Sequence, residues 1–149
     1  MLIQLGPEQV GVFWDGIRHG ITQVGRITGE SEELKQARVN KALENILSGK
    51  YQCWVIYDGD GEERKFYAFV LTYVYKDHLT EEESLFVDTL YGFRPMNNEM
   101  VRDVGERLTE YARGIGCTRM RAITSNKRVV EIMSICGLQP EVQIYGKEV

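Results

Sequence analysis

The residues best suited to chemistry lie around one strand and the helix that follows it. Asp88 stands in a strand expected over residues 85–91, and Asn97 and Asn98 stand where the next helix should begin. A loop that leads into a helix presents unpaired backbone N–H groups, which attract an anion. Function is therefore expected within residues 91–138 and in the strand just before them.

Asp88 is the only charged residue in that strand, which is otherwise apolar, hydroxylic or aromatic. Asp is depleted in strands, and burying its charge without a partner costs free energy. Its side chain therefore reaches solvent, has a partner, or acts as a general base in a cleft. Regular alternation puts Leu85, Val87, Thr89 and Tyr91 on one face of the strand and Phe86, Asp88 and Leu90 on the other.

The elements that would position these residues follow from hydrophobic spacing and turn signals. Helices are expected over about 98–113 and 126–137, with a strand over 119–124 between them. If the two strands and the first of these helices form a crossover, the strands are parallel. Upstream, the pattern predicts an edge strand at 1–5, helices beginning near Pro7 and Ser31 with Ser31 as an N-cap, and a hairpin of strands 53–57 and 66–75 joined by the turn Asp58–Gly61. The connection over 25–31 is either an ordinary surface loop or a segment that flanks a substrate entrance.

A final strand is expected around Val142–Tyr145. The strand at 66–75 is apolar or aromatic at nearly every position, so helices should cover both faces of the sheet. Val87, Leu71, Met120 and Leu108 each lie on the apolar face of an element and are expected to share one core. The predicted fold is α/β (α+β), a single domain over residues 1–149 with a mixed, mostly antiparallel sheet of about six strands.

Composition narrows the classes of function. A net charge of −4 and a pI near 5.3 argue against non-specific binding of nucleic acid, although Arg113, Arg119, Arg121, Lys127 and Arg128 form a local basic group. With no apolar run of about 18 residues and no signal-peptide pattern at the N-terminus, a protein of the cytoplasm with no membrane partner is expected. The three cysteines are expected to be free thiols, and the run Glu81–Glu83 near His78 suggests no metal site.

Two segments resemble the GNAT superfamily of acetyl-CoA-dependent N-acetyltransferases. Tyr111–Cys117 is similar to the end of that family's central helix and the turn after it, and Asn126–Leu138 has the spacing of its N-x-x-A-x-x-L-Y-x-x-x-G-F segment. The order of elements agrees over almost the whole chain. The resemblance implies acetyl-CoA as cofactor, with Thr89, Leu90, Arg94, Asn97, Asn98, Met100, Asn126 and Met133 as the residues that would bind it.

Two departures from the family pattern bear on that cofactor. The pyrophosphate loop, which falls at about 94–101, contains Pro95 and Glu99 and no glycine, so acetyl-CoA is expected to bind weakly. The family's general-acid tyrosine falls on Met133, which has no proton to donate. Tyr145, Tyr91 or Tyr111 could substitute, and Asp88 is the candidate base.

The chain is most similar to divergent GNAT-like proteins of tailed bacteriophages, in the entry Gly49–Val55, the segment Val70–Thr72 and the late Gly-Cys turn. Because both motifs are altered together, the favoured function is a non-catalytic binding or virion-associated module. The alternative is an acyl-CoA-dependent N-acetyltransferase acting on a protein or small-molecule amine. The expected partner is a phage or host protein, in the host cytoplasm or the virion.

Overall fold

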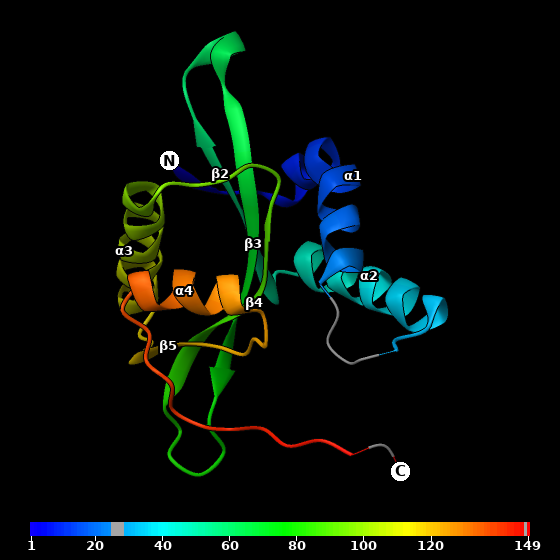
Figure 1. The fold of residues 1–149 in the computed structure, drawn as a ribbon, viewed down its shortest axis with the longest axis vertical. Helices are drawn as coiled ribbons and strands as arrows, with labels where there is room; N and C mark the ends of the chain where they lie inside the picture. Colours follow the sequence, from blue (N-terminus) through cyan, green and yellow to red (C-terminus); the bar gives the residue numbers. More distant parts are fainter. Residues whose placement is uncertain (25–28, 148) are drawn as a thin grey trace.

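The computed structural model of the chain describes residues 1–24, 29–147 and 149, so residues 25–28 of the expected connection lie outside the described part (Figure 1). The helices are α1 (Pro7–Gln23), α2 (Glu32–Leu47), α3 (Asn98–Gly114) and α4 (Lys127–Ile135), with a short 3-10 turn at Gly61–Glu63. The strands are β1 (Leu2–Gln4), β2 (Tyr51–Asp58), β3 (Lys65–Lys76), β4 (Glu83–Gly92) and β5 (Arg119–Ala122).

These strands form one sheet in the order β1-β2-β3-β4-β5. All neighbouring pairs are antiparallel except β4 and β5, which are parallel and joined through α3. The expected crossover and the mixed, mostly antiparallel sheet are therefore confirmed. Two helix starts follow the expected side-chain caps, since Ser31 accepts from the Leu34 N–H and Asn126 accepts from the Arg128 and Val129 N–H groups.

Helices cover both faces of the sheet, as predicted. In Figure 1, α1 and α2 lie on one side of the strands and α3 lies on the other. One buried cluster lies beneath α1 and α2 and includes Ile17, Phe69 and Leu71. A second cluster lies beneath α3 and α4 and includes Val87 and Leu108. The expectation that Leu71 shares a core with Val87, Met120 and Leu108 is wrong, because Leu71 lies on the opposite face of the sheet.

A β-bulge in β4 explains why Leu71 and Val87 lie on opposite faces of the sheet, and it corrects a second expectation about the faces of β4. Leu71 pairs with Thr89 and Thr72 pairs with Val87, which leaves Asp88 as an extra residue in β4. The extra residue reverses the alternation beyond it. Leu90 therefore packs on the α3 and α4 side together with Val87, and Tyr91 packs against the cluster beneath α1 and α2. The expected grouping of Val87 with Tyr91 on one face is wrong for this reason.

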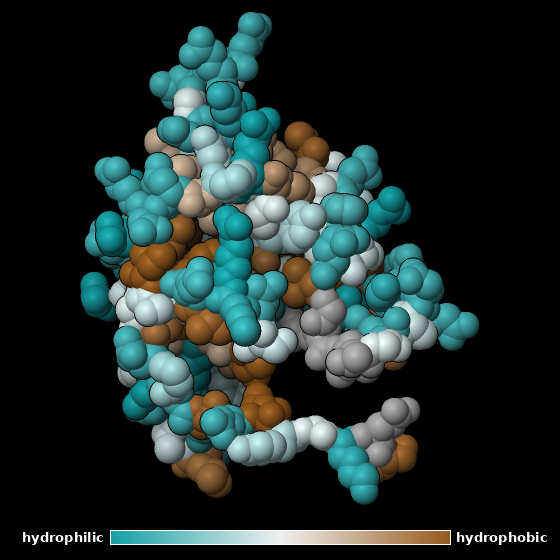
Figure 2. Space-filling view, viewed as in Figure 1, coloured by the Kyte–Doolittle hydropathy of each residue, from teal (hydrophilic) through white to brown (hydrophobic). Residues whose placement is uncertain are grey.

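The C-terminal segment differs from the expectation as well, since residues 139–147 form no strand. The sheet of the described residues therefore has five strands rather than about six. Glu141 holds this segment against β5 through side chains, with its oxygens 2.8 Å from Arg119 Nη1 and 3.1 Å from Arg121 Nε. Beyond Glu141, Val142 and Ile144 are 79% and 67% exposed. Figure 2 shows the segment standing away from the rest of the molecule, with a hollow above it. Side-chain ion pairs have replaced backbone pairing here.

In the described part of the chain, each helix is too short or too polar to span a membrane.

Candidate functional site

The two parallel strands separate at Asp88. Their pairing runs only from Ser84 opposite Arg119 to Val87 opposite Ala122, while β4 continues to Gly92. Beyond the bulge, the edge of β4 that faces β5 pairs with no strand of the described residues. The Asp88 carboxylate lies at this point, half-buried, and accepts from the Thr89 hydroxyl at 2.8 Å and the Tyr51 hydroxyl at 3.3 Å. The structure thus places Asp88 and Thr89 together where the sheet opens.

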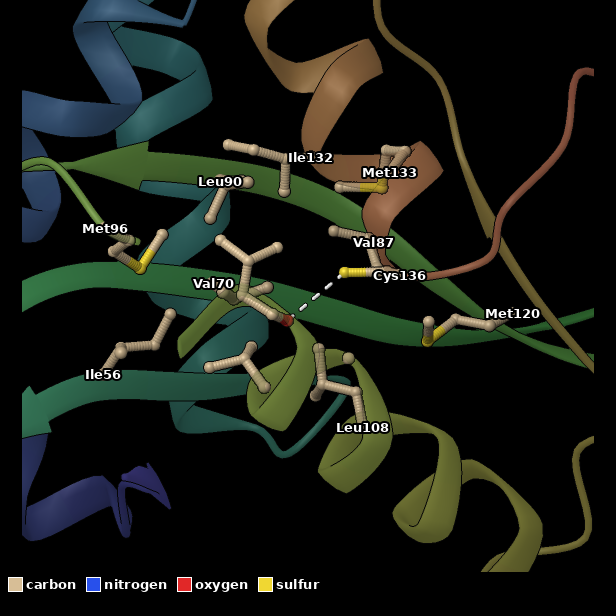
Figure 3. A pocket seen from close by; sticks show the side chains of 13 residues that line it. Ile56, Val70, Val87, Leu90, Met96, Leu108, Met120, Ile132, Met133 and Cys136 are labelled. Carbon is tan, nitrogen blue, oxygen red and sulfur yellow. Dashed lines mark hydrogen bonds between the residues drawn. The ribbon is translucent and has the colours of Figure 1, made fainter. Parts of the chain in front are cut away.

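An apolar cavity lies on the α3 and α4 side of this opening (Figure 3). Leu90 of β4, Met133 of α4 and Met96 of the loop before α3 line it, together with Val87 and Leu108. Its volume is about 30 Å³, which is the space of roughly one water molecule. Leu90 and Met133, which the resemblance assigns to the cofactor, thus line one small cavity, and Met96 lines it with them.

Helix α4 can close this cavity because it rests directly on α3. The Cys136 thiol at the end of α4 lies 3.5 Å from the Val101 carbonyl oxygen of α3 (Figure 3). A Cβ atom added to Gly105 of α3 would lie 2.8 Å from Cys136 Sγ. The glycine at 105 is therefore what allows the two helices to approach so closely.

Replacing Gly105 with Ala is expected to destabilise the protein by about 1–3 kcal/mol, because the new methyl group overpacks the contact with Cys136. Denaturant unfolding measures the change. The matched control is Gly11→Ala in α1, where nothing lies within 4 Å of the added Cβ and a small gain from helix propensity is expected. Equal stability of the two variants would contradict the close seating of α4 on α3.

The N-terminus of α3 lies beside the cavity mouth. Asn97 caps the helix, and its Oδ1 accepts from the Met100 N–H at 2.8 Å. The cap uses the N–H group of Met100, so the N–H groups of Asn98 and Glu99, also in the first turn, do not take part in it. Arg94 is exposed, and its backbone N–H donates to the Tyr67 carbonyl oxygen at 3.2 Å. The helix therefore begins at Asn98, as expected, with the carboxylate of Glu99 in its first turn.

The three tyrosines proposed as substitute acids lie in different surroundings. Tyr145 is 86% exposed in the C-terminal segment. Tyr91 packs on the α1 side, edge-on to His19 and Phe93. Tyr111 packs edge-on against Trp54 with ring centroids 4.8 Å apart, and burial raises its pKa. Asn126 is exposed and serves as the N-cap of α4, so its observed role is structural.

The cysteines are poor nucleophiles. Burial raises the pKa of the Cys53 thiol to about 12, and it raises the pKa of Cys117 and Cys136 as well. Since the thiolate is the reactive form, none of the three is activated at neutral pH. Among the described residues, no group of three or more His, Cys, Asp or Glu side chains could hold a metal ion.

Two residues of the site escaped the sequence analysis. Tyr51, whose hydroxyl donates to Asp88, is 37 residues away from it in the chain. Met96 lines the cavity from a loop where the expected feature was the pyrophosphate site. Nothing in the local pattern links position 51 to position 88, because their proximity depends on the pairing of β2 with β3 and of β3 with β4.

Comparison with solved structures bears on the fold of the chain. A predicted acetyltransferase from Clostridium acetobutylicum, solved with acetyl-CoA, matches 99% of this chain and 95% of its own, with a TM-score of 0.70 and 8% identity. The chain has the GNAT fold. A ribosomal-protein-alanine N-acetyltransferase from Brucella melitensis biovar Abortus 2308 matches with TM-score 0.68 and 10% identity over 100% of this chain and 99% of its own.

The glucosamine-6-phosphate N-acetyltransferase of Arabidopsis thaliana matches with TM-score 0.62 and 15% identity over 99% of this chain and 97% of its own. No protein-family model matches the chain, and no curated protein does either. The neighbours act on acceptors as different as a protein and a sugar phosphate, so the GNAT fold by itself selects no acceptor.

Proposed function

We infer that the protein is an acyl-CoA-dependent N-acetyltransferase that modifies an amine. The observation that carries this proposal is the bulge at Asp88, which places a carboxylate where β4 and β5 separate and where β4 has an unpaired backbone edge. Such an edge offers backbone N–H groups to a polarised carbonyl, and the carboxylate can take a proton. The likeness in fold to acetyltransferases supports the same proposal.

The N-terminus of α3 and the carboxylate of Asp88 fit the phosphates and the reacting end of acetyl-CoA, respectively. The cavity between them would have to widen. The backbone N–H groups of Asn98 and Glu99, in the first turn of α3, can donate hydrogen bonds to phosphate oxygens. The 30 Å³ cavity, however, is far below the volume of roughly 300 Å³ or more that ligand pockets have. Met96 and Met133 would have to turn outward, and unbranched methionine side chains do this readily.

Bound acetyl-CoA would supply the acyl group as a thioester. Asp88, directly or through a water molecule, would take the proton that the attacking amine loses. The methionine wall would exclude water from the reacting atoms. A thiol has a pKa of about 8.5, so a departing sulfur needs less help from a general acid than an amine would. The methionine at position 133 is therefore compatible with catalysis.

The experiment that tests this proposal is titration with CoA followed by a transfer assay. CoA at 100 times its dissociation constant should stabilise the protein by about 2.7 kcal/mol in a thermal unfolding measurement. Mass spectrometry should then detect acetylation of an amine supplied with acetyl-CoA. A protein that neither gains stability with CoA nor transfers the acetyl group would defeat the proposal.

Neutralising Glu99 is expected to tighten CoA binding. Its carboxylate shares the first turn of α3 with the N–H groups that would receive the phosphates. At about 5 Å in water, one pair of like charges costs about 0.8 kcal/mol, so Glu99→Gln should lower the dissociation constant about fourfold per interacting charge. Calorimetry measures this change, and Glu106→Gln, exposed further along α3, should leave the constant unaltered. Equal binding by wild type and Glu99→Gln would place the phosphates elsewhere.

The second candidate function is binding without catalysis: the protein would have the fold of an acetyltransferase and would not transfer an acetyl group. The filled cavity and the loop without glycine favour it. The association with a phage or host protein that the sequence resemblance suggests belongs to this candidate. Absence of CoA binding, together with recovery of a specific protein complex from infected or host cells, would support it.

A further inference from the structure

The C-terminal segment Val142–Tyr145 has the side-chain alternation of a strand, although it pairs with none of the described strands. The Tyr145 hydroxyl donates to Gln143 Oε1 at 2.6 Å, so these two side chains, two positions apart, lie on one side of the backbone. Val142 and Ile144 then share the other side, and they are 79% and 67% exposed. The segment is therefore a β-prone element with one apolar side that the described residues leave open to solvent.

The outer edge of β5 is the complementary feature. β5 is the last strand in the sheet of the described residues, so its backbone pairs with β4 on one side only. Met120 and Ala122 pack against the cluster beneath α3 and α4 and remain half-buried, while Ile123, just past the strand, is 58% exposed. Arg119 and Arg121 alternate with Met120 and Ala122, so they lie on the opposite face. An added strand would thus meet an apolar face and a basic face at this edge.

The segment does not cover this edge within its own chain. The Glu141 carboxylate lies 2.8 Å from Arg119 Nη1 and 3.1 Å from Arg121 Nε, so Glu141 is already level with β5. Because β5 has only four residues, the chain after Glu141 runs beyond it, and Figure 2 shows the segment standing away from the rest of the molecule. Drawing Val142 back alongside β5 would pull Glu141 off both arginines. The exposed segment and the open edge therefore belong to one chain without meeting in it.

We propose that two copies of this chain form a dimer by exchanging their C-terminal segments, so that Val142–Tyr145 of each copy adds a strand to the outer edge of its partner's β5. The apolar side of the incoming segment would lie against the apolar face of that edge. Its polar side would lie with the arginines, where the Tyr145 ring can pack on a guanidinium group. Backbone hydrogen bonds along the edge would join the two copies, as in other cases of strand addition.

A second copy fits this surface because it carries both of the exposed features. In a two-fold dimer each chain donates one segment and receives one, so every contact is made twice. The exchange would also cover the open N–H and C=O groups of an edge strand, which otherwise invite uncontrolled pairing. Met120 lines the cavity beneath α3 and α4, so the donated segment would support one wall of that cavity from outside. The inference concerns assembly and holds whether or not the protein transfers an acetyl group.

Sedimentation equilibrium of the unaltered protein tests the dimer directly. A mass twice that of one chain is expected, in an equilibrium that shifts with protein concentration. Val142→Asp combined with Ile144→Asp places carboxylates on the side that the partner would bury, and should raise the dissociation constant of the dimer at least about hundredfold. The control is Val12→Asp, at a position 80% exposed on α1, which should leave the constant unchanged. A monomeric wild type, or equal effects of the two changes, would overturn the proposal.

Mixing two defective variants separates exchange from general apolar association. Ile123→Asp places a carboxylate at the receiving edge and should by itself give a monomer. When this variant is mixed with the Val142 and Ile144 double variant, the intact segment of the first can pair with the intact edge of the second, so one of the two exchanges is restored. Native mass spectrometry should then detect a heterodimer, because the two variants differ in mass. No heterodimer in the mixture, or a dimer that persists in each variant alone, would rule out the exchange.

Discussion

Asp88→Asn is expected to lower the rate of acetyl transfer by about 10²- to 10⁴-fold, the usual contribution of a general base. The amide occupies the same space as the carboxylate and can still accept from the Tyr51 hydroxyl, so the fold should be retained. A loss in kcat that exceeds any change in the KM for acetyl-CoA would identify a group acting on the amine. Steady-state kinetics by mass spectrometry provide both values. Wild-type turnover in the Asn variant would remove Asp88 from the mechanism.

Deletion of Asp88 separates the carboxylate from the bulge. Without it, Val87 opposite Thr72 would be followed directly by Thr89 opposite Leu71, which is regular antiparallel pairing. Leu90 and Tyr91 would keep their present faces, so the deletion variant should fold cooperatively and still lack activity. Deletion of Phe86 is the control, because removing a paired residue shifts the rest of the strand by one position and moves apolar side chains to the wrong face. If both deletions unfold the protein, the bulge assignment is wrong.

Phe69→Ala is expected to destabilise the protein by about 3–5 kcal/mol, which is the usual cost of truncating a buried Phe. Its side chain is 1% exposed and is among the largest fully buried groups. The ring packs near Tyr91 and Phe93, with centroids 6.2 and 6.1 Å away, so it supports the end of β4 from beneath. Unfolding in urea, followed by circular dichroism, measures the change in the free energy of unfolding.

Val12→Ala is the comparison for Phe69→Ala, because Val12 is 80% exposed on α1 and its truncation should change stability by less than about 0.5 kcal/mol. Since a domain of ordinary stability has only about 5–15 kcal/mol in total, the Phe69 variant should lose a large share of it. A change near zero would mean that α1 and α2 do not cover the face of the sheet on which Phe69 lies.

Local sequence was sufficient to predict most elements and their order. The caps at Ser31 and Asn126, the hairpin signal at Asp58–Gly61 and the spacing of the apolar residues in α3 each act within a few residues. The sequence alone therefore predicts these elements, and it also predicts the parallel crossover that their order implies. Asp88 also indicated a special site by its residue type alone, because a carboxylate is unfavourable in the middle of an apolar strand.

Only the tertiary structure decided which faces and which neighbours these elements have. The bulge at Asp88 depends on the pairing of β4 with β3, so alternation alone placed Tyr91 on the wrong face and joined Leu71 to the wrong core. Tyr73 stacks on both Tyr51 and Phe86 because β2, β3 and β4 align residues from three separate segments. The β-prone stretch around Val142 formed no strand, since Glu141 meets the Arg119 and Arg121 side chains there and Pro140 lacks an N–H. Strand register and side-chain pairing depend on which residues, far apart in the sequence, compete for the same partner. A local sequence pattern does not contain that information.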